Sequence, residues 1–488
     1  MNLAEVIARH AAQSDAVAMV DGGRELSYRE LDRRVRRGGA HLRSLGIKPG
    51  DAIAICLKDT SDHVIAFLSA ARLGAVAVPI DWRAPPAERA RVAQGFGVKL
   101  ALTEAGAARI AGVPSRALDA SWHAEVERQD CDQEFPSDAD APLMIGLTSG
   151  TTGAVKGMLV THRQMHARAS PFDGILSERP HRYLSASPLA FSAGRNYCLT
   201  HLIKGHTVVF HPPLFTAEEY VEAINQNQVT VGFVVPTVIR WLLELPRGSG
   251  PLLPGVEVLM CGGAPLHAQE KRETLGRVTP NFYEVYGTVA TGPISFLRPS
   301  EMAEHADSAG RPAALWDLAI VGEDDRPVEP GATGRLRARG PALASGLVGA
   351  LTSDSEGFRD GWYYTGDLAE LDDGGFLHLK GRASDVILRG GSNVYPDEVE
   401  AALVEHVAVA DAAVVGRPSP QLGQEVVALV IARGAVTEDD LIAHCRRRLS
   451  AYKVPAEIVF VDGLPRTSFG KPDRKRLAGS IGERGAQR

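Results

Sequence analysis

The chain has 488 residues, of which 44% are hydrophobic and 23% are charged, and its formal net charge at pH 7 is -6. One hydrophobic core rarely serves a chain longer than about 300 residues, so we expect two or more domains. The composition is that of a globular protein, and the mild acidity gives no reason to expect nucleic acid or a membrane surface as a partner.

The five cysteines lie far apart and form no Cys-x-x-Cys pair. This spacing argues against both a disulfide framework and a zinc site, and it favours a reducing cytoplasm. Residues 1–13 carry charges within their apolar stretch, and no uninterrupted apolar run of about 18 residues follows. We therefore expect a cytoplasmic protein without a signal peptide or a membrane span.

Strand and helix patterns alternate along the N-terminal half of the chain. Residues 27–30 have the form of a capping box and predict a helix that ends near Gly46. A strand, a helix and a strand at 52–56, 63–73 and 75–80 follow, an order typical of parallel βαβ units. The same alternation predicts a helix at 86–95 and strands at 101–103, 142–147, 207–210, 232–235 and 257–261. These patterns predict an α/β architecture with several sheets.

The pattern changes in the C-terminal third. Residues 323–346 predict turns and short antiparallel strands. From Asp385 onward, strands at 411–416, 426–432 and 457–460 and helices at 396–405 and 438–449 predict a small α+β unit, with its boundary at 382–385. We expect residues 471–488 to be a frayed, solvated end.

Residues 147–157 form the glycine-rich stretch LTSGTTGAVKG directly after the strand expected at 142–147. Its glycines let backbone N–H groups turn inward together, its hydroxyls add donors, and its lysine supplies a mobile charge, so the stretch suits phosphate. It does not follow the P-loop spacing, because Val155 precedes Lys156 and Gly157 follows it. An ordinary turn remains the alternative.

Seven motifs recur along the chain in the order that they have in one known family. They are LTSGTTGAVKG, SPLAFSAG, MCGGAPL, EVYGT, GWYYTGDLAE, GRASDVILRGGSNVYPDEVE and PRTSFGKPDRKRL. With them the chain, from Tyr28 to Leu477, resembles the adenylate-forming superfamily of acyl-CoA synthetases, peptide-synthetase adenylation domains and luciferases.

The resemblance implies an α/β fold with a large N-terminal domain at residues 1–382. That domain is expected to contain two parallel-type sheets with helices and a small β-barrel-like subdomain. A hinge at 383–385 and a small, mobile α+β domain at 386–488 are expected to follow. The hinge position is Ser384, which is small enough to absorb a large φ/ψ change.

The family's chemistry has two steps. ATP first converts an acid into an acyl-adenylate with loss of pyrophosphate, and the thiol of coenzyme A or of a carrier protein's pantetheine then attacks the acyl carbon. The resemblance therefore implies ATP, acyl-AMP or AMP, and coenzyme A as ligands, with Mg²⁺ only if adenylation is retained.

The resemblance also implies nucleotide-binding roles. The loop over the phosphates corresponds to Thr148, Ser149, Thr151, Thr152 and Lys156. The segments beside the adenine, with Tyr286 stacked on the base, correspond to Gly262, Gly263, Ala264, Pro265, Tyr286, Gly287 and Thr288. Asp367 matches the carboxylate on the ribose hydroxyls, and Arg382 matches an arginine near the ribose and the phosphate. Lys471 matches the lysine that bridges the acid's carboxylate and the α-phosphate, so Lys471, Arg382 and Lys156 are the expected catalytic residues.

The acyl pocket and the thiol route follow from the same resemblance. The pocket is expected to be lined by Phe191, Gly194, Arg195, Phe233, Val234 and Cys261. Glycines at 194, 232, 262 and 263 suggest room and residues 234–236 suggest an apolar wall, so a bulky hydrophobic acid is favoured. Arg195 and Asn196 either meet a polar substituent of the acid or, for Arg195, lie at the surface. An amino acid is disfavoured, since no aspartate lies near Phe233, and Gly390 and Gly391 match the pantetheine tunnel.

One motif departs from the family. Two and three positions after Gly287 the family usually has threonine and glutamate, and this chain has Val289 and Ala290. Neither side chain can bind a hard cation, so no residue is assigned to a metal. We expect adenylation to be impaired. The protein would then mainly catalyse thioesterification, using an acyl-adenylate made by a separate partner enzyme.

Three alternatives stay open. A complete two-step synthetase would hold Mg²⁺ through pyrophosphate oxygens, waters and Lys156. A stand-alone domain would load a carrier protein, and Leu422, where many CoA ligases have an aromatic residue, slightly favours that acceptor. A non-catalytic relative would only bind the acid or the adenylate. Whether the chain is a monomer or a homodimer also stays open.

Overall fold

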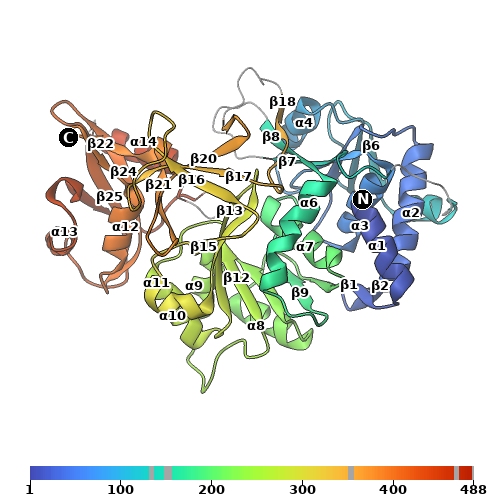
Figure 1. Ribbon diagram of the computed structural model, residues 1–488, viewed down its shortest axis with the longest axis horizontal. Helices are drawn as coiled ribbons and strands as arrows, with labels where there is room; N and C mark the ends of the chain where they lie inside the picture. The colour runs from blue at the N-terminus through green and yellow to red at the C-terminus, as the bar shows by residue number, and fades with distance from the viewer. Residues whose placement is uncertain (131–136, 148–155, 350–356, 467–471, 486–488) are drawn as a thin grey trace.

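The computed structural model describes residues 1–130, 137–147, 156–349, 357–466 and 472–485, and it has four β-sheets in that part of the chain (Figure 1). Two large sheets, A and B, make up the N-terminal part. A smaller sheet, C, follows, and sheet D with its helices lies at the end of the long axis opposite to α1 and α2. The predicted α/β fold class is confirmed.

Sheet A has nine strands, and its central strands are parallel. In spatial order they are β15 (Arg311–Pro312), β14 (Gly292–Leu297), β13 (Phe282–Thr288), β12 (Val258–Gly262), β11 (Val231–Val234), β9 (Arg182–Ser185), β10 (Thr207–Phe210), β1 (Val17–Asp21) and β2 (Arg24–Ser27). Antiparallel strands occur only at its two ends.

Sheet B has seven strands with the same mixture of a parallel centre and an antiparallel end. In order they are β18 (Gly346–Gly349), β8 (Lys156–Thr161), β7 (Pro142–Leu147), β4 (Val76–Pro79), β3 (Ala52–Cys56), β5 (Leu100–Glu104) and β6 (Ser115–Leu118). Every strand predicted for sheets A and B is present, with each end within one residue of its predicted position.

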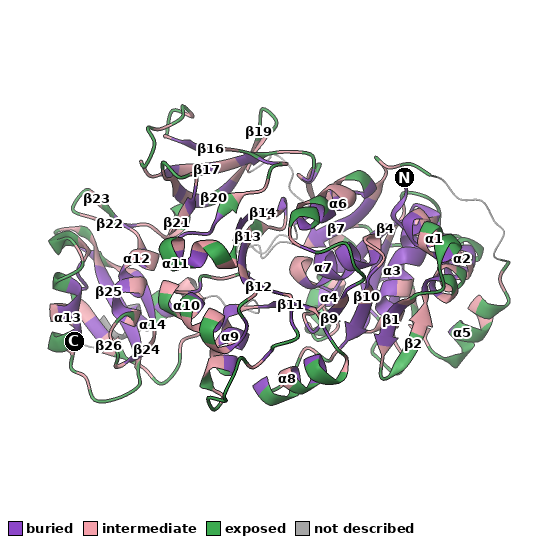
Figure 2. Ribbon diagram, turned by 60° about the horizontal axis from the view of Figure 1, so that its bottom comes forward, coloured by how far each residue is buried: buried purple, intermediate pink, exposed green. Residues whose placement is uncertain are grey.

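Helices fill the space between sheets A and B and cover their outer faces (Figure 2). The main core lies between the sheets, with side chains from α1 (Leu3–Gln13), α2 (Tyr28–Ser44), α3 (Ser61–Leu73), α6 (His162–Ala169) and α7 (Ser192–Ile203). The outer face of sheet A packs against α8 (Ala217–Gln226), α9 (Pro236–Glu244) and α10 (Ala268–Arg277). The outer face of sheet B packs against α4 (Pro86–Gly95). The remaining helices before sheet C are α5 (Ala120–Glu127) and α11 (Met302–His305).

Helix α2 shows how the sequence sets an element's limits. The Ser27 side chain accepts the Glu30 N–H at 3.3 Å, as an N-cap residue does. In a full capping box the Glu30 carboxylate would also accept the Ser27 N–H. Here that carboxylate accepts from Arg33 and Arg34 instead. The helix ends at Ser44, and Gly46 follows with φ of +86°, which favours glycine.

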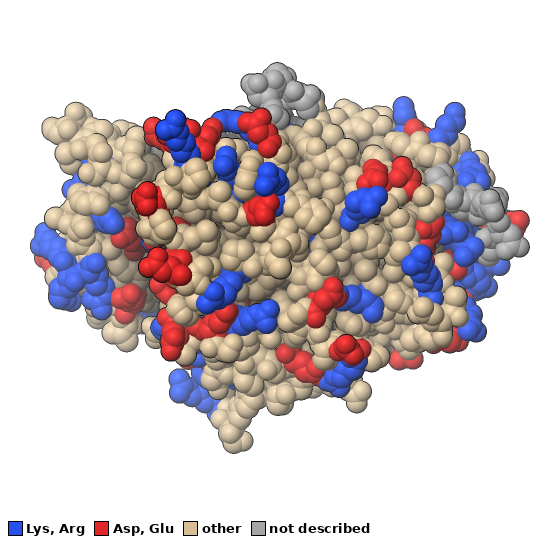
Figure 3. All heavy atoms as spheres, in the orientation of Figure 1, with Lys and Arg blue, Asp and Glu red and all other residues tan. Residues whose placement is uncertain are grey.

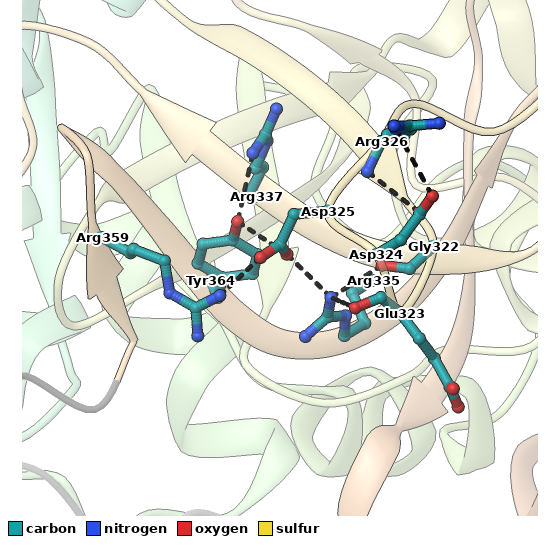
Figure 4. A network of polar contacts seen from close by, with 9 residues as sticks. All are labelled: Gly322, Glu323, Asp324, Asp325, Arg326, Arg335, Arg337, Arg359 and Tyr364. Atoms are coloured by element: carbon teal, nitrogen blue, oxygen red, sulfur yellow. Dashed lines mark hydrogen bonds and ion pairs between the residues drawn. The ribbon is translucent and has the colours of Figure 1, made fainter.

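Sheet C is the small β subdomain expected after sheet A. Its strands are β16 (Asp317–Val321), β17 (Gly334–Arg339), β20 (Trp362–Leu371), β19 (Phe358–Arg359) and β21 (Leu377–Arg382). One carboxylate links its turn to its strands, because Asp325 accepts hydrogen bonds from Arg335 Nη2 at 2.8 Å, Tyr364 Oη at 3.0 Å and Arg359 Nη1 at 2.5 Å (Figure 4). Asp325 has φ of +62°, so these three bonds hold a turn residue in a conformation that is rare outside glycine.

Sheet D begins after Asp385 with β22 (Ile387–Arg389) and forms the expected α+β unit. Its other strands are β23 (Ser392–Val394), β25 (Gly423–Ala432), β24 (Val409–Ser419) and β26 (Glu457–Phe460), and its helices are α12 (Pro396–Val404), α13 (Glu438–Arg446) and α14 (Arg474–Gly485).

The expectation of a frayed end is wrong for residues 474–485, which form α14. Leu477 and Ile481 are buried against β24 and β25, four residues apart on one helix face. Arg474 lies among three carboxylates, at 3.1 Å from Asp385, 2.7 Å from Asp397 and 2.6 Å from Glu400. The sequence did not predict this helix, because its residues are mostly basic or polar and only a few apolar residues anchor it.

Charged side chains of both signs are interspersed over the face shown in Figure 3. None of the helices in the described ranges combines the length and the apolar character needed to cross a membrane.

The buried face of α14 gives a stability prediction. We expect Leu477→Ala to lower the free energy of unfolding of the sheet D unit by about 2–4 kcal/mol, because it removes a fully buried side chain. The control is Arg476→Ala, an exposed neighbour on the same helix, which we expect to change stability by less than about 0.5 kcal/mol. Urea unfolding of the two variants measures the difference, and equal, negligible effects would support a frayed end after all.

Candidate active site

The glycine-rich stretch connects β7 to β8. These strands pair antiparallel, with Leu147 opposite Gly157 and Gly146 opposite Met158. Both ends of the stretch therefore lie at the same end of this strand pair. Lys156 is the first residue of β8 and pairs with Gly349 of β18. Thr148, Ser149, Thr151 and Thr152 lie outside the described residues, as does Lys471.

Tyr286, Asp367 and Arg382 are brought together from sheets A and C. The Tyr286 hydroxyl donates a hydrogen bond to Asp367 Oδ2, and Arg382 Nε lies 2.9 Å from Asp367 Oδ1. The register of β20 and β21 places Asp367 opposite Arg382, and Arg382 Nη1 donates to the Thr365 carbonyl at 2.8 Å. Burial, followed by the charge of Asp367, raises the pKa of Tyr286 well above its usual value, so this tyrosine remains a donor at neutral pH.

The segment predicted to lie beside the adenine begins at the carboxyl end of β12. Gly262 is opposite Val285 of β13, and a Cβ at Gly262 would lie 2.5 Å from the Val285 carbonyl oxygen. Only glycine therefore lets these two strands approach so closely. Gly263 has φ of +93°, and its turn leads into Ala264 and Pro265. Ligands of α/β sheets bind at such carboxyl ends of parallel strands.

The turn after Gly287 contains Val289 and Ala290, where the sequence predicts a departure from the family's motif. The hydroxyls of Thr288 and Thr291 lie 3.0 Å apart and hydrogen bond to each other. The carbonyl oxygens of Val289 and Ala290 both accept from Arg168 Nη2, at 3.2 Å and 2.7 Å, and the Ala290 side chain is fully buried. The backbone of this turn is thus held by a buried guanidinium.

The side chains of this turn do not fit a protein-bound magnesium ion. Mg²⁺ takes oxygen ligands, whereas Val289 and Ala290 have none and the two threonine hydroxyls are already paired. Across the described ranges, no group of three or more His, Cys, Asp or Glu side chains is arranged to hold a metal.

The predicted acyl-pocket residues do not form a single wall. Phe233 packs in the core between the sheets, where its ring stacks on Tyr197 at 4.3 Å, whereas Val234 and Cys261 pack in the core under α8 and α9. Successive residues of a strand point to opposite faces, so Phe233 and Val234 of β11 are separated by the sheet. Phe191 is partly buried at the N-cap position of α7.

The expectation that glycines open room in the pocket is wrong for three of the four. A Cβ at Gly194 would lie 2.4 Å from the Pro188 carbonyl oxygen, and one at Gly232 would lie 2.8 Å from the Tyr220 hydroxyl. Gly262 is equally close to β13, as described above. These glycines permit tight packing, and only Gly263 has space beside it, with Val235 Cγ1 at 3.9 Å.

Arg195 is buried, so its interpretation as a surface residue is wrong. Its side chain lies in the main core, and Nη1 donates to the carbonyls of Leu189 and Ala190 at 3.1 Å and 3.0 Å. Asn196 donates through Nδ2 to the Ser192 hydroxyl at 3.1 Å, and its Oδ1 has no hydrogen-bond partner within the described part of the chain.

Two residues near the site were missed in the sequence. Asp59 is buried, accepts the Leu189 N–H at 2.5 Å and so holds the turn before Phe191, and burial raises the pKa of its carboxyl. Arg168 was missed because helix α6 is polar and its arginines look solvated. No motif spacing marks either residue.

The proposed thiol route and hinge lie near sheet D. Gly390 and Gly391 form the turn between β22 and β23 with φ of +57° and +82°, a pair that suits a two-residue hairpin. Gly390 N–H donates to the Leu422 carbonyl at 2.7 Å, so the departed Leu422 lies beside these glycines. Ser384 is exposed in a 3₁₀ turn, and its hydroxyl donates to Asp385 at 2.9 Å.

Comparison with known proteins identifies the class. The model of the AMP-binding enzyme family matches residues 7–348, and that of the AMP-binding enzyme C-terminal domain matches residues 398–471. The chain therefore belongs to the AMP-binding enzyme family.

Within the family, several similar proteins are acyl-CoA ligases. The chain is 34% identical to a feruloyl-CoA synthase of an Amycolatopsis species, over 93% of this chain and 94% of that one. It is 33% identical to an indoleacetate–CoA ligase of Aromatoleum aromaticum, over 96% of each chain. The o-succinylbenzoate CoA synthetase of Bacillus subtilis, solved with its acyl-adenylate, is 27% identical over 97% of each chain with a TM-score of 0.87, and it has also been solved with ATP and a magnesium ion. The chain is thus an acid-thiol ligase of the acyl-CoA synthetase type.

Proposed function

We propose that the protein is a complete, ATP-dependent acyl-CoA ligase that joins an aromatic or similarly bulky acid to coenzyme A through an acyl-adenylate. The observation that carries the proposal is the convergence of Tyr286, Asp367 and Arg382 from strands of two sheets. Relatives that are 33–34% identical over more than nine-tenths of the chain are named for ferulate and indoleacetate, and both of these acids contain an aromatic ring.

In this proposal, Asp367 accepts the ribose hydroxyls, because an ionised carboxylate is a pure acceptor with two oxygens. Tyr286 supplies its ring to the adenine, and Arg382 reaches the ribose and the phosphate. Lys156 and Lys471 act on the phosphates, and Gly390 and Gly391 border the thiol's route. Rotation near Ser384 exchanges the adenylating and thiol-transferring arrangements.

A restricted enzyme is the second candidate, and Val289 and Ala290 favour it. They supply no oxygen ligand where the family usually has threonine and glutamate. Such a protein would carry out thioesterification on an acyl-adenylate from a partner enzyme. A carrier-protein acceptor is a further variant of this proposal.

One assay separates the candidates. The purified protein is incubated with ATP, Mg²⁺, coenzyme A and each of ferulate, indoleacetate and 2-succinylbenzoate, and in parallel with synthetic acyl-adenylates in place of ATP and acid. A complete ligase releases pyrophosphate and forms thioester at on the order of 1 s⁻¹ or faster with its preferred acid. Thioester formed only from acyl-adenylates would favour the restricted enzyme, and binding without thioester would contradict both.

The role of Asp367 gives a binding prediction. We expect Asp367→Asn to weaken AMP binding about 10- to 100-fold, because a charge-assisted hydrogen bond contributes about 1.5–3 kcal/mol. Asp372→Asn is the matched control, since Asp372 is a carboxylate on the same hairpin that binds the Phe376 N–H and His378. Isothermal titration measures both, and an unchanged affinity in Asp367→Asn would contradict the ribose assignment.

The departed motif gives a kinetic prediction. If the natural protein already catalyses adenylation without impairment, we expect Val289→Thr with Ala290→Glu to change the rate of pyrophosphate release by no more than about threefold. A gain of tenfold or more would instead support the restricted enzyme. Because Ala290 is fully buried, Val289→Thr alone is measured in parallel as a nearly isosteric variant.

A further inference from the structure

Arg195 is a buried cation with an unused donor. It is only 3% exposed, its Nε donates to Met144 Sδ at 3.1 Å, and its Nη1 donates to the carbonyls of Leu189 and Ala190. No residue of the described part of the chain accepts a hydrogen bond from Nη2. Nη2 is not one of the fully buried side-chain atoms that lack a partner in the described ranges, so it is the donor of Arg195 that a ligand can reach.

No carboxylate compensates this charge within the described ranges. Burial lowers the pKa of Arg195 to about 10, which still leaves the guanidinium charged at neutral pH. The charge of Arg195 contributes to lowering the pKa of Arg168, which is buried as well, and that of His63. A negatively charged ligand would therefore stabilise this guanidinium.

Arg195 Nη2 lies close to Gly146 of β7 and to Val289 of the turn after Gly287. A Cβ built on Gly146 would lie 3.6 Å from Arg195 Nη2 and 3.1 Å from Val289 Cγ1. Gly146 is the penultimate residue of β7, directly before the glycine-rich stretch, and Val289 stands where the family's threonine stands. Arg195 thus faces the turn that has lost the residues for magnesium and the α-phosphate.

We propose that Arg195 binds the negatively charged junction of the acyl-adenylate, the α-phosphate with the adjoining acyl oxygens, through Nη2. It supplies there the fixed positive charge that the turn at Val289 and Ala290 no longer recruits. This inference rests on the proposed function and names a phosphate-binding residue for it.

The chemistry is consistent with that role. A guanidinium presents planar donors that match phosphate and carboxylate oxygens, and it carries its charge at all relevant pH values. The carbonyls of Leu189 and Ala190 fix its orientation before the ligand arrives, so little side-chain entropy is lost on binding. The same buried environment that makes the free charge costly strengthens its contact with an anion.

The test compares AMP with adenosine, which differ by the phosphate. Their dissociation constants are measured by isothermal titration in EDTA-containing, Mg²⁺-free buffer for the natural protein, Arg195→Met and Arg195→Lys. We expect Arg195→Met to weaken AMP about 10- to 100-fold with adenosine changed less than about twofold. We expect Arg195→Lys, which keeps the charge, to retain most of the preference for AMP.

The controls separate charge from structure. Arg168→Met removes a second buried arginine that holds the carbonyls of Val289 and Ala290, and we expect it to affect AMP and adenosine alike. Equal losses of AMP and adenosine in Arg195→Met, no loss of AMP, or a larger AMP-selective loss in Arg168→Met would each overturn the inference. If Arg195→Met does not fold, Arg195→Gln replaces it and is judged by the same ratio.

The proposed function fails separately. A natural protein that binds AMP selectively through Arg195 but forms no thioester would contradict the ligase proposal and leave the Arg195 result standing. A natural protein that forms thioester, with AMP affinity unchanged in Arg195→Met and Arg195→Gln, would contradict the Arg195 inference and leave the ligase proposal standing.

Discussion

The carboxylate of Asp367 joins sheet A to sheet C. It accepts a hydrogen bond from Tyr286 of sheet A and pairs with Arg382, which is the last residue of sheet C before the link to sheet D. Bonds between separate sheets fix a site only if each sheet is itself rigid. Here the close approach of β12 and β13 at Gly262 and the Asp325 network in sheet C supply that rigidity.

A second constraint is the pair of buried arginines around the turn after Gly287. Moving an ion from water into a protein costs several kcal/mol even after relaxation, so two guanidiniums without carboxylates are expensive to keep. Arg168 donates hydrogen bonds to three carbonyls, those of Val289, Ala290 and Ala342, which offset part of this desolvation penalty. Arg195 bonds to two carbonyls, those of Leu189 and Ala190, and in our proposal an anionic ligand is its further partner.

Much of the fold could be predicted from local patterns. The strands of sheets A and B and the helices α2, α4 and α12 follow from apolar runs, capping residues and glycine stops, which act over a few residues. Helix α14 could not, because it depends on Leu477 and Ile481 meeting a sheet formed elsewhere in the chain. The site divides in the same way. Motifs indicated Tyr286, Asp367 and Arg382, whereas the burial of Arg195 and the roles of Arg168 and Asp59 depend on tertiary contacts that no spacing encodes.

The glycines show why a residue type alone is ambiguous. A glycine provides space only if nothing else occupies it, and at Gly194 and Gly262 a carbonyl oxygen from a neighbouring segment does. The same reasoning applies to Val289 and Ala290. As isolated substitutions they remove a hydroxyl and a metal-binding carboxylate, which would weaken the first half-reaction. In our proposal, Arg195 supplies positive charge beside this turn, whose side chains at Val289 and Ala290 bind no metal. The turn and the buried arginine therefore have to be considered together, because both affect how the site balances the charge of its ligand.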